Sequence, residues 1–129
     1  MHELGITEGI IERAREAAQA AGGVKVADVY LTITPAADFT VDSIEMYFEM
    51  LTDDDDYFCG ARLHWETQTA AASCLQCGAA FQASETRPVC PHCGGRQVRF
   101  DARAAMLQLV GVDVVEEGDP RPDDVGGSP

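Results

Sequence analysis

The chain has 129 residues, enough for one small domain or for one domain that carries a smaller metal-binding module. Its 22 acidic side chains outnumber the 9 Lys and Arg residues, which gives a net charge of −13. This balance leaves no basic stripe for a phosphate backbone, so we expect no nucleic acid partner. The sequence shows no secretory signal and no apolar run long enough to span a membrane, so we expect a cytoplasmic protein without membrane contact.

The first two predicted elements are a helix and a strand. In residues 4–21, apolar side chains recur at three- and four-residue spacings, which predicts an amphipathic helix that ends at Gly22. The segment Val24–Thr34 alternates between apolar and polar side chains, with Val29 and Leu31 on the apolar side. This alternation predicts a strand with one face toward the core.

A second helix is predicted after Thr40 or Asp42, either of which can act as its N-cap. Its apolar side chains have the spacing i, i+3, i+4 and i+7, at Ile44, Tyr47, Phe48 and Leu51. The acidic run Asp53–Asp56 follows the helix, and we interpret it as a charged turn. A calcium-binding loop would need alternating ligands and a glycine at fixed positions.

Two further strands are predicted near the middle and the end of the chain. Ala61–Thr67 alternates, with Leu63 and Trp65 between polar neighbours, as in a half-buried strand. Ala105–Val115 forms a final predicted strand that Gly111 interrupts. Together the strands would form a small three-stranded sheet with two helices on one face, which is an α+β fold.

Two Cys-x-x-Cys pairs lie between the last two strands. Cys74 and Cys77 form the first pair, Cys90 and Cys93 the second, and twelve residues separate them. A glycine follows each pair and permits the left-handed backbone that such a turn needs. Two facing turns supply four sulfurs and leave no open coordination position, so we predict a structural zinc site. Disulfide bonds or free thiols are the alternative, which the doubled motif disfavours.

The amino-terminal tripeptide Met1-His2-Glu3 is the other unusual feature. A free α-amine titrates near ~7.7–8 and can therefore bind a metal around neutral pH. The amine, the His2 backbone nitrogen and a His2 ring nitrogen would form fused chelate rings, and Glu3 could add a fourth donor. Planar, nitrogen-rich sets suit Ni(II) or Cu(II) better than tetrahedral zinc. An exposed histidine without a function is the alternative for this tripeptide taken alone.

Several motifs at separate places in the chain point to one family. They are Met1-His2-Glu3-Leu4, Tyr47-Phe48-Glu49, Gly60-Ala61-Arg62-Leu63, Cys74-x-x-Cys77-Gly78 and Cys90-Pro91-x-Cys93-Gly94. With these motifs, residues 1–115 resemble the HypA/HybF family of nickel metallochaperones, which help to mature [NiFe] hydrogenases. The cysteine pattern alone is common to many zinc ribbons, whereas its combination with an amino-terminal Met-His-Glu is much more specific.

The resemblance implies a function and two metal sites. Nickel would be bound by Met1, His2 and Glu3, and zinc by the four-cysteine module. The protein would deliver Ni(II) to the hydrogenase large subunit precursor together with a GTPase of the HypB type. We expect a monomer or a weak homodimer.

The same resemblance implies that the zinc module is inserted into the nickel-binding domain. The predicted nickel-binding α/β domain comprises residues 1–69 with 101–117, and the inserted zinc-binding domain comprises residues 70–100. Residues 118–129 combine proline, glycine and acidic side chains, which predicts a disordered acidic tail.

Three other residues could bind a metal, and each has a simpler interpretation. Cys59, the odd cysteine, is predicted to be a small core residue. His64 lies on the polar side of a predicted strand and is expected at the surface. His92 lies between Cys90 and Cys93 and is expected to be exposed, because four cysteines already satisfy zinc.

The sequence contains no recognisable catalytic set and no phosphate-binding loop, so no enzymatic activity is predicted. Two other functions remain as alternatives. The cysteine motifs also resemble those of rubredoxin-like iron electron carriers, although rubredoxins have a longer spacing and no surrounding α/β domain. A zinc-ribbon protein-interaction adaptor, in which the amino-terminal motif is accidental, would show no specific nickel affinity.

Overall fold

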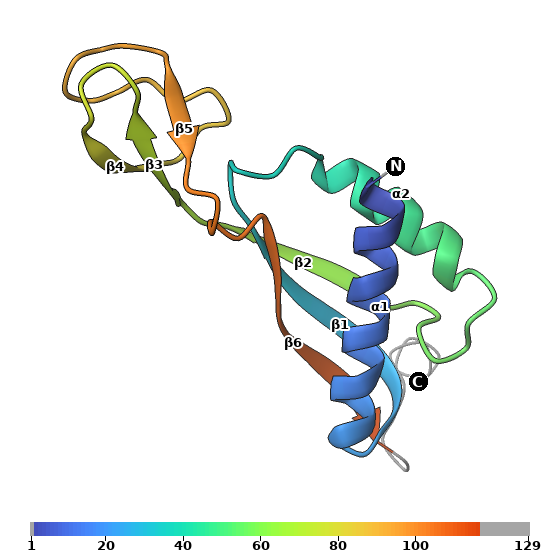
Figure 1. The fold of residues 1–129 in the computed structure, drawn as a ribbon. Helices are drawn as coiled ribbons and strands as arrows, with labels where there is room; N and C mark the ends of the chain where they lie inside the picture. Colours follow the sequence, from blue (N-terminus) through green and yellow to red (C-terminus); the bar gives the residue numbers. More distant parts are fainter. Residues whose placement is uncertain (1, 117–129) are drawn as a thin grey trace, which may run out of the picture. The chain divides into compact units, whose positions relative to one another are not determined.

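The computed structural model describes residues 2–116, so Met1 and the predicted tail 118–129 lie outside the described residues. The elements, in chain order (Figure 1), are α1 (His2–Ala20), β1 (Gly23–Ile33), α2 (Val41–Thr52), β2 (Arg62–Thr67), β3 (Ala70–Cys74), β4 (Ala80–Ala83), β5 (Val98–Phe100) and β6 (Leu107–Glu116). They form two three-stranded sheets, one with the order β2-β1-β6 and the other with the order β4-β3-β5.

The described chain divides into two compact units. We call residues 2–31, 39–64 and 109–116 the helical unit, because it contains both helices. We call residues 32–38 and 65–108 the cysteine unit, because it contains both Cys-x-x-Cys pairs. The predicted boundaries of a nickel-binding domain and an inserted zinc-binding domain differ in detail from these units and stay a prediction.

Helix α1 begins at His2, two residues before the predicted start, and packs against α2. Its buried face contains Ile10, Ala14 and Ala18, whose spacing of four residues keeps them on one side. The alanines are fully buried, so a neighbouring element lies close to the helix backbone at these positions. The helix is followed by Gly22 at a φ of +78°, a conformation that glycine adopts without the steric penalty of a side chain.

Helix α2 has the predicted cap and a narrower buried face than predicted. The Thr40 side chain accepts a hydrogen bond from the Ser43 backbone nitrogen at 3.1 Å, which satisfies one donor of the first turn. Ile44 and Phe48 are buried, whereas Leu51 is 37% exposed. The prediction that Leu51 faces the core is therefore wrong, because the buried line of α2 keeps a four-residue spacing and ends at Thr52.

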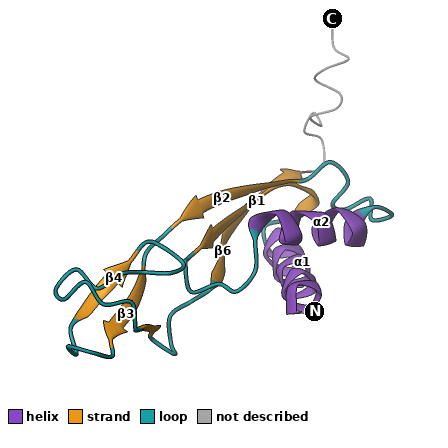
Figure 2. Ribbon diagram, turned by 90° about the horizontal axis from the view of Figure 1, so that it is seen from above, coloured by secondary structure: helices purple, strands orange, loops and turns teal. Residues whose placement is uncertain are grey.

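The first sheet has β1 in its centre, and Figure 2 shows both helices on the same side of it. Val29 and Leu31 lie on the same face of β1 and are almost completely buried, as expected for a central strand covered on one face. Val26 is also fully buried. Strand β6 pairs beside β1 and continues through Gly111, so the predicted interruption at this glycine is wrong. The predicted α+β class, with two helices and a small three-stranded sheet, is confirmed.

The second sheet belongs to the cysteine unit, and none of its strands was predicted from the sequence. Strand β3 is central and antiparallel to both neighbours, with Ala72 opposite Phe81 on one side and Phe100 on the other. The buried positions are mainly alanines, including Ala70 and Ala83. Alanine has a low preference for strands, so the local sequence gave little indication of a sheet.

Candidate metal centre

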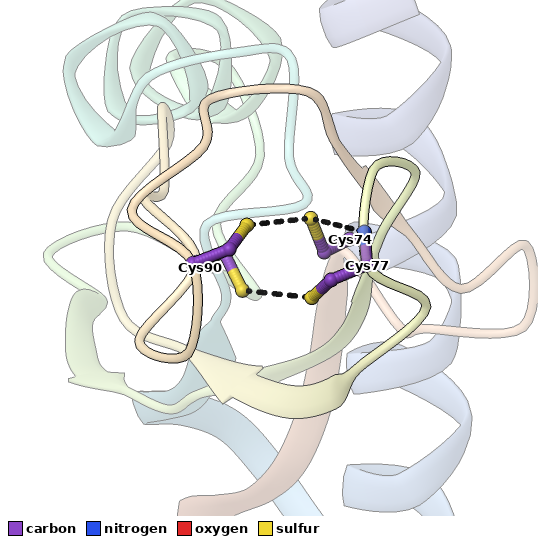
Figure 3. Close-up of side chains that lie close together, drawn as sticks. Cys74, Cys77 and Cys90 are labelled. Atoms are coloured by element: carbon purple, nitrogen blue, oxygen red, sulfur yellow. Dashed lines mark hydrogen bonds between the residues drawn. The ribbon is translucent and has the colours of Figure 1, made fainter.

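The four paired cysteines converge on one point of the cysteine unit. Their sulfur atoms all lie within 4.8 Å of one another. The sulfur atoms of Cys74 and Cys93 lie 3.6 Å apart, as do those of Cys77 and Cys90, and each of these contacts joins one pair to the other. Figure 3 shows Cys74 and Cys77 facing Cys90 across this point. Cys74 and Cys90 are buried, and the second cysteine of each pair is exposed.

Both cysteine turns have the same backbone geometry. The Gly78 nitrogen donates to the Cys74 carbonyl at 2.9 Å, and the Gly94 nitrogen donates to the Cys90 carbonyl at 2.9 Å. These glycines have φ angles of +77° and +73°, in the left-handed region that disfavours residues with a Cβ atom. The predicted role of a glycine after each pair is thus present in the structure, and it is needed twice.

Backbone amides point at the two buried sulfurs. The Cys74 sulfur lies 3.4 Å from the Gln76 nitrogen and 3.5 Å from the Cys77 nitrogen, and the Cys90 sulfur lies 3.4 Å from the His92 nitrogen. The amide of Cys77 is the largest of the effects that lower the pKa of the Cys74 thiol to about 6, against the opposing effect of desolvation. The pKa of Cys90 is also lowered, chiefly by the Cys93 amide, so backbone amides stabilise the thiolate form of both buried cysteines.

The pKa of Cys93 moves in the opposite direction. The Gly95 amide lowers it, but contacts with the Cys74 and Cys90 sulfurs, together with desolvation, raise it to about 12. Four sulfurs this close cannot all be ionised without a cation, because each thiolate disfavours the next. A divalent ion would displace the remaining protons and offset half of the charge of the four thiolates, which leaves a net charge of about −2 on the centre.

The donor set fits zinc. Tetrahedral zinc with Zn–S bonds of about 2.3 Å places its sulfur ligands about 3.8 Å apart, close to the contacts of 3.6 Å found here. Four thiolates also close the coordination sphere, which is typical of structural rather than catalytic zinc sites. Among the described residues, this is the one group of three or more His, Cys, Asp or Glu side chains close enough to share an ion.

The amino-terminal candidate is described only in part. Met1 lies outside the described residues, and His2 is the first residue of α1. Glu3 is half-buried in the first turn of the same helix. His2 and Glu3, two of the predicted nickel ligands, thus belong to the first turn of α1.

The other candidate ligands have mixed outcomes. Cys59 is exposed, so the prediction of a core position is wrong; the neighbouring Phe58 is the residue that is buried. Cys59 and Gly60 are the central residues of a turn in which the Ala61 nitrogen donates to the Phe58 carbonyl at 2.9 Å and Gly60 has a φ of +79°. His92 and His64 are exposed, as predicted.

His64 nevertheless has specific partners on the polar face of the first sheet. Its Nε2 atom lies 2.7 Å from the Asp28 carboxylate, and its ring stacks on Tyr30 with a centroid distance of 4.9 Å. The Tyr30 hydroxyl donates to the Asp113 carboxylate at 2.6 Å, and this hydrogen bond is the main cause that raises the pKa of Tyr30 to about 12. The alternation of the strand predicted the exposure of His64, but not these contacts.

Asp55 has a structural role that was not predicted from the sequence. Its carboxylate pairs with Arg15 of α1 and accepts a hydrogen bond from the Tyr57 nitrogen at 3.0 Å. The hydrogen bond from Arg15 is the main cause that lowers the pKa of Asp55. The Arg15 guanidinium also lies 5.0 Å from the ring centre of Phe58. Four consecutive aspartates gave no signal for which one would pair with a residue 40 positions earlier.

Comparison with known proteins places this architecture in a family. Residues 1–110 match the family model described as "Hydrogenase/urease nickel incorporation, metallochaperone, hypA". The chain belongs to the HypA family. Among HypA relatives, the hydrogenase maturation factor HypA of Caldanaerobacter subterraneus subsp. tengcongensis is 32% identical over 114 residues, which cover 88% of this chain and 99% of that protein. The HypA of Azotobacter vinelandii is 33% identical over 99 residues, covering 77% and 87% of the two chains.

A solved HypA structure shows the same fold. The solution structure of the Ni metallochaperone HypA from Helicobacter pylori superimposes with a TM-score of 0.62 at 17% identity, covering 89% of this chain and 98% of that one. The family that the sequence motifs indicated is thus confirmed, and the chain is a nickel metallochaperone of hydrogenase maturation. A metallochaperone is consistent with the prediction of a protein without enzymatic activity. No helix among the described residues is long and apolar enough to cross a membrane.

Proposed function

We propose that the chain binds Ni(II) at its amino terminus and delivers it to the hydrogenase large subunit during maturation in the cytoplasm. The α-amine of Met1, the backbone and ring nitrogens of His2, and Glu3 would be the ligands. The observation that supports this most directly is the Met1-His2-Glu3 sequence within a family match that begins at residue 1.

The helix start at His2 supports this ligand set on physical grounds. The first backbone N–H groups of a helix have no intrahelical acceptor, so a metal can displace the His2 amide proton without breaking a helical hydrogen bond. The positive end of the helix dipole disfavours a cation at this place. The deprotonated amide and the acidic Glu3 of the first turn would offset that effect.

We further propose that zinc occupies the four-cysteine centre and has a structural role. The two centres would then differ in how readily the bound metal can be transferred to another protein. Zinc is closed in by four sulfurs from two turns, whereas nickel at a chain end can be reached by an incoming ligand. A terminal site therefore suits transfer to the large subunit precursor, with energy from nucleotide hydrolysis supplied by a GTPase partner of the HypB type.

The decisive experiment is a nickel titration of untagged, zinc-loaded protein that begins at Met1. We expect one equivalent of Ni(II), with the d–d absorption of a planar nitrogen-rich complex. A variant with a short amino-terminal extension and the His2→Ala variant should both lose this band and keep their zinc.

Two matched controls use the other histidines of the chain. His64→Ala and His92→Ala remove an exposed imidazole elsewhere and should leave the nickel band unchanged. Equal nickel binding by the extended and the native protein would show that the proposed site is wrong. Loss of zinc in His2→Ala would contradict the assignment of nickel and zinc to separate centres.

A further inference from the structure

Helix α2 exposes two methionines that the nickel and zinc proposals do not use. Met46 is 51% and Met50 is 63% exposed, and they lie one helical turn apart on the side away from the buried Ile44 and Phe48. A surface hollow of about 410 Å³ lies against these methionines and is also lined by Glu49. Single exposed apolar residues are normal, but two adjacent large ones beside a hollow form a contact surface.

A line of carboxylates runs along α2 beside the methionines. Glu45, Glu49 and Asp53 are exposed and follow at four-residue spacings, so they lie on one face. Within the described part of the chain, none of the three forms an ion pair with a basic side chain. The same three residues line a second hollow, of about 570 Å³, on the side of residues 58–64. The carboxylates therefore form an acidic ridge between two hollows.

The ridge is unfavourable for the isolated helix. Like charges four residues apart repel each other, and α2 has no basic residue in its last turn to balance them. Helix α1 provides an internal comparison, because Glu8, Glu12 and Glu16 have the same spacing and are also exposed. Near these residues α1 carries Arg13 and Arg15, and none of the large exposed apolar side chains lies on it. Only on α2 does the acidic line border an exposed apolar surface.

We propose that this face of α2, formed by Met46, Met50 and the ridge Glu45, Glu49 and Asp53, docks a basic amphipathic helix of a partner protein. Methionine side chains adapt to the shape of an apolar partner face, and the ridge supplies acceptors for lysine or arginine. The net charge of −13 would speed the encounter with a basic partner. The proposal is independent of the nickel site, because none of the proposed metal ligands lies on α2.

The test uses a designed probe and the full, zinc-loaded chain. The probe is a fluorescent 18-residue peptide with leucines on one helical face and lysines on the other, and anisotropy measures its binding. We expect saturable binding that weakens about tenfold in Met46→Ser/Met50→Ser and about tenfold in Glu45→Gln/Glu49→Gln. All of these positions are exposed, so the variants should fold, which zinc content and circular dichroism would verify.

The control variant Glu8→Gln/Glu12→Gln removes the same charge at the same spacing from α1. It should change the affinity less than about twofold, since it lies outside the docking face. Equal weakening in the control, or no weakening in the methionine variant, would show that the peptide binds by non-specific charge attraction and would overturn the proposal. Self-association that Met46→Ser/Met50→Ser abolishes, without peptide binding, would identify a second copy as the occupant and also overturn it.

Discussion

The helical unit and the cysteine unit differ in the size of their apolar cores. Almost all of the completely buried larger side chains belong to the helical unit, among them Phe58, Leu31, Ile44 and Val26. Cys90 is the one such residue in the cysteine unit, whose other buried positions are mostly alanines. A small unit without a sizeable apolar core needs a metal or disulfides to fold. If zinc fills the centre as proposed, the metal would take the place of an apolar core in the cysteine unit, whereas apolar packing suffices in the helical unit.

The largest effect is expected from the cysteines. Cys90→Ser removes a buried ligand, so zinc should be lost and the cysteine unit should unfold, because structural zinc contributes about 10–16 kcal/mol to folding in small zinc domains. The helical unit should keep its dispersed amide signals in an NMR spectrum. Cys59→Ser, at an exposed position outside the centre, is the control and should retain zinc. A cysteine unit that stays folded without zinc would break the comparison.

Two glycine substitutions should have opposite signs in the two units. Gly78→Ala places a Cβ atom at a φ of +77°, which costs about 1–2 kcal/mol and should weaken zinc binding about tenfold in a chelator competition. Gly9→Ala lies inside α1, where a Cβ atom would meet no other atom within 4 Å. It should stabilise the helical unit by about 0.5–1 kcal/mol in a urea titration. Equal effects of both changes would argue against this difference between the units.

An effect of similar size is expected from the link between Arg15 and Asp55 in the helical unit. Arg15→Ala should lower the free energy of unfolding by about 1–2 kcal/mol, because it removes a partly exposed ion pair and the contact with the Phe58 ring. Arg13→Ala, an exposed arginine two positions earlier, should change it by less than about 0.5 kcal/mol. Zinc content should be unaffected in both variants.

The same link predicts a dependence on pH. The pKa of Asp55 is lower in the folded protein than its ordinary value, so its contribution is fully present above about pH 4 and is lost as the pH falls through the folded pKa. The difference in stability between wild type and Arg15→Ala should therefore be constant from neutral pH down to about pH 5 and shrink in stronger acid. A difference that grows with acidity would show that the ion pair is not its source.

Regular spacing predicted much of the helical unit. The apolar spacing of α1 and the alternation in β1 and β2 are patterns over a few neighbouring residues. The structure contains all three elements near the predicted positions. The four cysteines were equally predictable, because the turn that brings each pair together is encoded within five residues. In each case a local pattern sufficed.

The parts that were not predicted depend on partners far away in the chain. Strands β3 and β5 exist because Ala72 pairs with Phe100, 28 positions later, and the alanine-rich segment has no strand pattern of its own. The choice of Asp55 among four aspartates depends on Arg15, 40 positions earlier. Tertiary contacts determine each of these features, and the residues that are neighbours in the sequence do not indicate them.

The central position of β1 has a consequence for chain connectivity. Strands β2 and β6 flank it on either side. The chain therefore leaves the sheet at the end of β2 and returns at the start of β6, two strand spacings away, or about 10 Å, after the intervening segment 68–106. A loop of only a few residues can bridge such a gap. Insertions, deletions and replacements within 68–106 can therefore be accommodated without a change in the strand order of the sheet. The length and composition of this segment can vary while the helices and the sheet keep their structure.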